Sequence, residues 1–527
     1  MFSYPLETPL SPWTMPPRIT MFHIRCVPGL VMLSGTVVLA TIVAITFVSS
    51  FLRLRRIPGP WWAAFTRLWL VRTLALGDAA TEFDNVNKAY GPVARVGTNH
   101  LLIDDPWAAR RILETHSRYV RSAGFDSFKH DPRLGNIVSE QEPSMHNQLR
   151  RKLAAGYSGK DVESVEGNVN IRILECMKTV DEDWTSSSNS TKLFDISRMI
   201  QYLTMDVITH LLFGDPFGYV RTQSDVHGFL KIVQERLPVV EQFSVLTELC
   251  SLLVLISYIP WVKNILPSRR DEHGVGRVMK AAHQAVVKRF QPDITPQNDM
   301  LGSFLRHGLT ADQAESEITV ALFAGSDTTA TSTRATLVHI ITNPLVYTKL
   351  QREIDQAIAS GSISSPIAID EALKLPYLQA CIKEGLRILP PVASLRERVT
   401  PPEGDFLNGF FVPGGVNVGF NLRAMQRNKV FGSDPEVFRP ERWLEQDEER
   451  IAEMDKVHSI IFNYGESKCL GMRIANLTLN KFFVELLRRF DVTVVNPCHP
   501  FETICHQIYF VKELIVRCAR REDLQRP

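Results

Sequence analysis

A single cysteine near the C-terminal end stands in a context that can hold it as a reactive thiolate. Cys469 lies in FNYGESKCLG between Gly465 and Gly471, and the apolar, helix-periodic run MRIANLTLNKFFVELLRRF follows. If a helix begins near Leu470, its unsatisfied N–H groups and its macrodipole stabilise a thiolate. The two glycines also remove side chains around the sulfur, so a flat, bulky partner can approach the backbone closely.

The other cysteines give little sign of chemistry. The sequence has eight cysteines among 527 residues, and they are scattered. They do not suggest a disulfide framework, which favours a reducing compartment, and each is ordinarily a small apolar core residue. Cys498-His499 and Cys505-His506 put metal-binding types side by side, but adjacent positions do not match the spacing of zinc ligands. A thiolate presented singly, as at Cys469, suits a haem iron better than zinc or an iron–sulfur cluster.

A long helix is the second unusual feature. The sequence predicts it from Ala311 to Thr342, with Thr310 and Gln313 as a capping box at its start. Its middle, ALFAGSDTTATS, has a glycine and several hydroxyls where a helix normally has strong formers. We expect either close packing against this segment or a bend within it.

Four short motifs occur in a characteristic order. They are A-G-x-D-T-T at 324–329, E-x-x-R at 384–387, P-E-R-W at 440–443 and F-x-x-G-x-x-x-C-x-G at Phe462, Gly465, Cys469 and Gly471. Their order and spacing resemble the cytochrome P-450 superfamily, from roughly residue 58 to the end. Any one motif is weak, but four in order are specific. RIPGPWWAAFTRLW and FGSDPEVFRPERW are similar to fungal, microsomal-type members.

The resemblance implies a fold and a reaction. The fold is mainly α with a small β portion, the cytochrome P-450 fold, preceded by one N-terminal transmembrane helix. The cofactor is haem b, with its iron ligated axially by Cys469. The reaction is an NADPH- and O2-dependent oxidation of a small lipophilic substrate, in fungal secondary metabolite biosynthesis. Electrons come through NADPH-cytochrome reductase, with cytochrome b5 as a further partner.

The resemblance also assigns roles within the long helix. Gly325 makes room for dioxygen, and Asp327 with Thr328 relays protons. Such a relay needs an acid and a hydroxyl that are adjacent and partly desolvated. An exposed polar patch is the alternative, but the flanking ITVALFAG favours burial. Expected pocket residues are Val320, Phe323, Val392 and the 120–140 loop.

A structural network is implied around the E-x-x-R motif. Glu384 and Arg387 would form a buried network with Arg442 and so fix the loop that leads to Cys469. The alternative for Glu384 and Arg387, three residues apart, is an ordinary ion pair on a helix face, which contributes under about 0.5 kcal/mol.

Basic residues are expected to hold the haem propionates. His146 and Arg150 would share one helix face and contact them, although a solvated basic face is the alternative. Arg398 is a similar candidate, and Arg396 is a second choice there. The family usually has arginine or histidine two residues before the cysteine, whereas this chain has Ser467. A neutral serine cannot pair with a propionate charge, so haem affinity or redox potential is expected to differ.

The N-terminal part of the sequence predicts a membrane anchor. We predict a tail at 1–26, a transmembrane anchor at 27–52, a basic and proline hinge at 53–60, and the haem-thiolate monooxygenase domain at 61–527. The uncharged stretch 27–52 exceeds the about 20 residues that span a bilayer core, and a cleaved signal peptide would have a shorter apolar region. The arginines of RLRR after it predict that the catalytic domain is cytosolic. The resemblance to microsomal members implies a single-pass endoplasmic reticulum membrane protein.

Further elements follow from local patterns. A hairpin is expected at 93–103, a small β region at 406–420, and a last pair of short strands at 492–495 and 508–511. The apolar stretch 246–261 is expected to be a buried core helix, with a surface patch that dips into the membrane as the alternative. The balance of 59 basic and 57 acidic residues, with no basic stripe, excludes nucleic acid as an expected partner.

Two other functions remain open at this point. A haem-thiolate isomerase or dehydratase would act without O2 or a reductase, and it would not need a relay such as Asp327 with Thr328. A non-catalytic membrane haem-binding protein is the second alternative, which Ser467 mildly favours. Turnover that depends on NADPH and oxygen separates the three.

Overall fold

The computed structural model divides the chain into two compact units, Met1–Arg53 and Leu54–Pro527. It describes residues 37, 41, 45, 48–129, 131, 133–187, 189–257, 259, 269, 274–291, 296–394 and 397–521. The predicted tail and most of the predicted anchor at 27–52 lie outside the described residues. Within the described residues, no helix is both long and apolar enough to cross a membrane.

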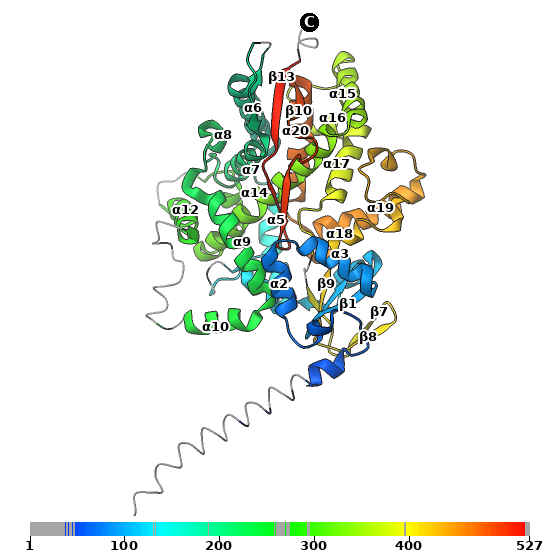
Figure 1. Ribbon diagram of the computed structural model, residues 1–527. Helices are drawn as coiled ribbons and strands as arrows, with labels where there is room; N and C mark the ends of the chain where they lie inside the picture. Colours follow the sequence, from blue (N-terminus) through cyan, green and yellow to red (C-terminus); the bar gives the residue numbers. More distant parts are fainter. Residues whose placement is uncertain are drawn as a thin grey trace, which may run out of the picture. The chain divides into compact units, whose positions relative to one another are not determined.

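The unit Leu54–Pro527 is mainly helical, as the sequence predicts (Figure 1). The α-helices of its described part are α2 (Leu68–Leu76), α3 (Ala79–Tyr90), α4 (Pro106–Leu113), α5 (Pro143–Ser158), α6 (Val165–Thr179), α7 (Ile196–Phe213), α8 (Tyr219–Thr222), α9 (Phe229–Val245), α10 (Thr247–Ser257), α12 (Gly274–Arg289), α13 (Met300–Arg306), α14 (Ala311–Ile341), α15 (Pro344–Ala359), α16 (Ile369–Ala372), α17 (Pro376–Ile388), α18 (Leu422–Met425), α19 (Glu448–His458) and α20 (Met472–Arg489).

Helix α14 runs through the middle of the helical part and packs against α7, α17 and α20 (Figure 1). The predicted capping box is confirmed, since the Thr310 side chain accepts from the Gln313 N–H and the Gln313 side chain accepts from the Thr310 N–H. The weak helix formers in its middle do not break it. Two of their hydroxyls bond to carbonyls four residues earlier, Thr328 to Ala324 at 2.7 Å and Ser332 to Thr328 at 2.9 Å, which satisfies these two groups within the helix.

The β portion consists of several small sheets. The strands in the described part are β1 (Val93–Gly97), β2 (His100–Ile103), β3 (Val120–Arg121), β4 (Thr185–Ser186), β5 (Phe194–Asp195), β6 (Arg398–Val399), β7 (Asp405–Leu407), β8 (Phe410–Val412), β9 (Asn417–Phe420), β10 (Phe490–Val494), β11 (Glu502–Cys505), β12 (Tyr509–Lys512) and β13 (Ile515–Arg520). The predicted hairpin at 93–103 is confirmed as the antiparallel pair β1 and β2. In the region predicted at 406–420, β7 and β8 form a hairpin, and β9 joins β2 in parallel.

The last predicted strands exist, but they do not pair with each other. Strand β10 pairs with β13, and β12 pairs with β11. Their partners were not predicted, because a strand pattern shows that a segment is extended and not which distant segment lies beside it.

The stretch 246–261 corrects another prediction. Helix α10 is not a buried core helix, because three of its leucine side chains are exposed: Leu249 to 44%, Leu252 to 50% and Leu255 to 69%. The composition alone could not distinguish a buried face from an exposed apolar one.

The proline segment of the predicted hinge packs onto β1. The N–H of Arg95 donates to the Pro58 carbonyl at 2.7 Å, and a Cβ on Gly59 would lie 2.0 Å from the Arg95 carbonyl oxygen. Leu54 and Ile57 are buried as well. This segment is therefore fixed at the start of the larger unit.

Candidate active site

One cavity of about 340 Å³ brings together most residues that the sequence singled out. Those in its lining are His146, Arg150, Gly325, Asp327, Thr328, Arg398, Phe462, Cys469 and Gly471, with the expected pocket residues Val320, Phe323 and Val392. The segment 120–140 contributes Arg121, Ser122, Gly124, Phe125, Phe128, Ile137 and Val138. Gly465 and the Glu384, Arg387 and Arg442 group lie outside the lining.

Cys469 is held by its loop rather than by the first turn of α20. The helix begins at Met472, two residues later than predicted. The N–H of Cys469 donates to the Phe462 carbonyl at 2.8 Å, and the thiol is exposed to the cavity. Gly465 has a φ of +60°, and a Cβ there would lie 2.2 Å from a backbone oxygen, so the preceding turn requires glycine.

Two arginines meet at the serine that departs from the family pattern. The Ser467 hydroxyl oxygen accepts from Arg121 Nη2 at 3.3 Å and from Arg398 Nη2 at 3.1 Å. Arg150 donates to the Lys468 carbonyl at 2.6 Å. The loop before Cys469 therefore has guanidinium groups around it, although it carries no arginine at residue 467.

His146 lies beside this group as a neutral base. Burial, reinforced by the positive charge of Arg121, lowers the pKa of His146 to about 4. Its Nε2 lies 2.9 Å from Arg121 Nη2, so the neutral ring accepts from the guanidinium. We therefore expect His146 to orient Arg121 instead of supplying a charge.

Sequence reasoning missed Arg121. It belongs to β3, and its Nη1 donates to the carbonyls of Ile137, Val138 and Glu140 at 2.8 to 3.0 Å. No motif marks this arginine, and its partners lie many residues away. The only available signal was its place in the 120–140 segment, which was expected to line the pocket.

Asp327 is buried against α7. Its Oδ1 accepts from Gln201 Nε2 at 3.0 Å, and Gln201 Oε1 in turn accepts from Arg334 Nη2 at 2.8 Å. Burial raises the pKa of Asp327 to about 6, although the nearby charge of Arg334 opposes the shift. Within the described part of the chain, no group donates to the second oxygen, Oδ2. The carboxyl can therefore change its protonation state near neutral pH.

Thr328 and Gly325 lie next to this carboxyl on the cavity side. The Thr328 hydroxyl donates its proton to the Ala324 carbonyl, so its oxygen can accept a hydrogen bond from a group in the cavity. A Cβ on Gly325 would lie 3.3 Å from the Ile208 side chain of α7. A side chain at 325 would thus press on α7 as well as narrow the cavity.

The Glu384 network is buried, unlike an ordinary ion pair on a helix face. Glu384 and Arg387 are fully buried, and Arg442 is 1% exposed. Arg387 Nε and Arg442 Nε each donate to Glu384 at 2.8 Å, and Trp443 Nε1 donates at 2.9 Å. Burial alone would raise the pKa of Glu384, but the bonds and charges of both arginines outweigh it and hold that pKa below its ordinary value. This network joins α17 to the 440–443 segment.

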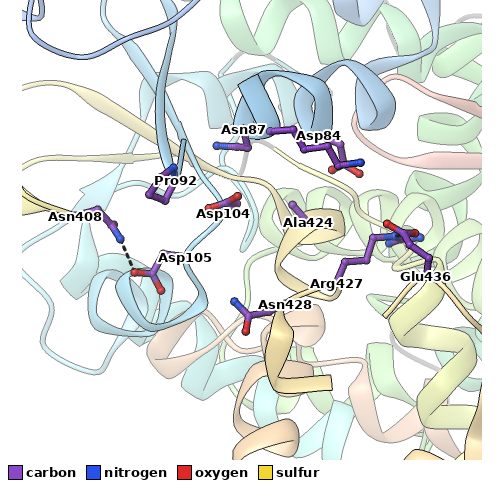
Figure 2. Close-up of a pocket in the computed structure, with 11 residues that line it drawn as sticks. Asp84, Asn87, Pro92, Asp104, Asp105, Asn408, Ala424, Arg427, Asn428 and Glu436 are labelled. Atoms are coloured by element: carbon purple, nitrogen blue, oxygen red, sulfur yellow. Dashed lines mark hydrogen bonds and ion pairs between the residues drawn. The ribbon is translucent and has the colours of Figure 1, made fainter. Parts of the chain in front are cut away.

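A second hollow, of about 370 Å³, has many polar side chains in its lining (Figure 2) and shares no lining residue with the first cavity. Two pairs of its polar groups bond to each other: Asn408 Nδ2 donates to Asp105 at 2.8 Å, and Arg427 pairs with Glu436 at 2.6 Å. Nowhere in the described ranges do three histidine, cysteine or acidic side chains come together in a way that could hold a metal ion. The cysteine and the acid that the sequence singled out, Cys469 and Asp327, both line the first cavity.

The lining of that cavity fits a haem. Among the described residues that line it, Cys469 is the one cysteine, so a soft ligand is presented singly. The cations needed for two carboxylate groups are present in Arg121, Arg150 and Arg398. A Cβ on Gly471 would lie 3.9 Å from the Cys469 sulfur, so glycine keeps the space beside the thiol open. Fold and site together define a haem-thiolate protein.

Comparisons with known proteins identify the family. The cytochrome P-450 family model matches residues 56–512, and the chain belongs to this family. It is 36% identical to the cytochrome P-450 monooxygenase ABA1 of Pyricularia oryzae, over 93% of this chain and 97% of the relative. The corresponding Botryotinia fuckeliana protein is 34% identical over 90% and 93%. The monooxygenase gsfF of Penicillium aethiopicum is 28% identical over 86% and 92%. The chain is thus a haem-thiolate monooxygenase.

Proposed function

We propose that this enzyme oxidises a small lipophilic substrate with O2 and electrons from NADPH, delivered by a reductase, in fungal secondary metabolism. Cys469 ligates the iron of haem b. The observation that carries the proposal is the shared cavity of the Cys469 thiol and the Asp327–Thr328 pair. When bound, haem supplies the activation of dioxygen, with one oxygen atom entering the substrate and the other leaving as water.

The chain's own residues supply binding, protons and exclusion of water. Thr328 holds a water or a bound group through its acceptor oxygen, and Asp327, with its pKa near 6, exchanges protons beside it. Aliphatic and aromatic side chains, Phe125, Phe323 and Val392 among them, keep the remaining cavity dry. An isomerase would need no such acid, which favours the monooxygenase over that alternative.

Reconstitution tests the proposed function. We expect the membrane-bound enzyme, co-expressed with an NADPH-cytochrome reductase and supplied with a panel of lipophilic compounds, to form oxygenated products. Labelled O2 should place one labelled atom in the product. Product formation without NADPH or O2 would instead support the isomerase alternative.

Haem retention gives a prediction about Arg121. We expect Arg121→Leu to lose haem about 10-fold faster, because a charge-assisted hydrogen bond contributes about 1.5–3 kcal/mol. Ser467→Arg should not tighten haem retention, because the new positive charge would stand beside two others. In the wild type, Arg121 Nη2 and Arg398 Nη2 lie 3.3 and 3.1 Å from the Ser467 hydroxyl oxygen. Transfer of haem to apomyoglobin measures the rates. Tighter haem binding by Ser467→Arg would show that Arg121 and Arg398 do not fully neutralise the haem propionates.

We also propose a single-pass anchor in the endoplasmic reticulum membrane, with the catalytic unit cytosolic and in contact with lipid. The support is the uncharged stretch 27–52 and an exposed apolar surface on the larger unit. That surface comprises Trp61, Phe65, Leu68, Leu249, Leu252 and Leu255. Arg67 joins its two parts, since it pairs with Glu248 at 2.6 Å and donates to the Val245 carbonyl at 2.9 Å.

Membrane fractionation checks this proposal. We expect removal of residues 1–52 to leave part of the folded protein on membranes, because the apolar surface still partitions into lipid. Adding Leu252→Glu and Leu255→Glu should release that remainder, whereas Val437→Glu, at a 53% exposed site outside the surface, should not. Equal retention of all three truncated proteins would place the lipid contact elsewhere.

A further inference from the structure

One amide in the largely apolar cavity wall is held in a fixed orientation. Gln507, just before β12, is 4% exposed and lines the cavity together with Ser244 near the end of α9. Gln507 Nε2 donates to the Ser244 hydroxyl oxygen at 3.0 Å. Other lining residues from the same segments are the apolar Val240, Val245, Val392 and Ile508, together with the buried carboxyl of Glu241.

The hydrogen bonds decide which way the amide points. The Ser244 hydroxyl donates its one proton to the Glu241 carbonyl at 2.6 Å, so its oxygen can only accept from Gln507. The amide nitrogen must then face Ser244, which assigns the nitrogen and the oxygen from the network. Among the described residues none donates to Gln507 Oε1. The oxygen and the second N–H are left for a molecule in the cavity.

The backbone around Gln507 is rigid. Its carbonyl accepts from the Ala393 N–H at 2.7 Å, and the Tyr509 N–H donates to the Pro391 carbonyl at 2.9 Å. Thr331 of α14 donates to the Tyr509 carbonyl at 3.1 Å. The amide is thus presented from a segment tied on both sides, as a preorganised recognition group requires.

We propose that Gln507 determines specificity by binding a hydroxyl group on the lipophilic substrate, a refinement that rests on the proposed function. A hydroxyl both donates and accepts, which matches the free Oε1 and the second N–H. A hydrocarbon in the same place would leave this amide buried and unpaired, and sites built to pair a hydroxyl reject analogues that lack it. The substrate therefore carries a hydroxyl group before this enzyme acts, so an earlier reaction must form that hydroxyl, by oxygenation, hydration, carbonyl reduction or hydrolysis.

Matched probes test the proposal on the haem-loaded enzyme. Equilibrium dialysis with labelled cyclododecanol, cyclododecyl methyl ether and cyclododecane compares one skeleton with and without a hydroxyl. We expect the alcohol to bind about 10-fold more tightly than the hydrocarbon. The methyl ether, which cannot donate to Oε1, should bind less tightly than the alcohol.

Three variants locate the preference. Gln507→Leu should abolish it, Ser244→Ala should weaken it by freeing the amide to rotate, and Ile508→Leu, next in the chain and apolar, should keep it. The inference is overturned if wild type shows no preference for the alcohol or if Gln507→Leu retains it. A carbon-monoxide spectrum and NADPH turnover of each protein report on the proposed function separately, so failure of one does not hide failure of the other.

Discussion

Replacement of Cys469 by serine is expected to abolish the thiolate signature and all NADPH-dependent product formation. The reduced, carbon-monoxide-bound wild type should show the strongly red-shifted Soret band that a thiolate ligand produces. A serine oxygen is a harder and weaker electron donor, so neither the band nor oxygen activation should survive. We expect the loop to keep its conformation in this variant, because the Cys469 side chain is exposed and the bond from its N–H to the Phe462 carbonyl is a backbone bond.

The matched control is Cys498→Ser. Cys498, like Cys469, is exposed and forms no disulfide, but it lies outside the lining of the cavity. We expect this variant to keep the band and the activity. A Cys469→Ser protein that retained the thiolate band would place the iron ligand on another residue.

The sequence predicted those parts of the site that have local signatures. Cys469 with its glycines follows from residue types at short spacing. The Asp327–Thr328 pair lies in a short motif, and its role was implied by the family resemblance. The start of α14 followed for the same reason, because its capping box needs only Thr310 and Gln313.

What the sequence missed depends on residues far apart in the chain. Ser467 predicted a haem affinity or redox potential that differs from the family's, but it gave no sign of Arg121, 346 positions away, which donates to its hydroxyl. Gln201, 126 positions from Asp327, lies behind that carboxyl and could not be assigned from any motif. The exposed leucines of α10 belong to the same class, because burial is decided by which elements pack against a helix.

The Thr328→Ala variant is expected to uncouple NADPH consumption from product formation. In the wild type the Thr328 oxygen is free to accept, since its proton is bonded to the Ala324 carbonyl at 2.7 Å, and Asp327 beside it titrates near pH 6. Losing a positioned group in proton transfer typically costs about 10²-fold or more. Product should fall by that order, while NADPH and O2 continue to be consumed, and the two electrons should appear in hydrogen peroxide.

Thr333→Ala is the control that separates this role from helix stability. The Thr333 hydroxyl makes the same kind of bond, to the Thr329 carbonyl at 2.8 Å, but Thr333 does not line the cavity. Both variants lose one such bond within α14, so only a role in the cavity distinguishes them. We expect both to bind haem and to show the thiolate band, and Thr333→Ala to stay coupled. Full coupling in Thr328→Ala would remove the hydroxyl from the proton path, and an enzyme indifferent to both NADPH and this substitution would be the isomerase.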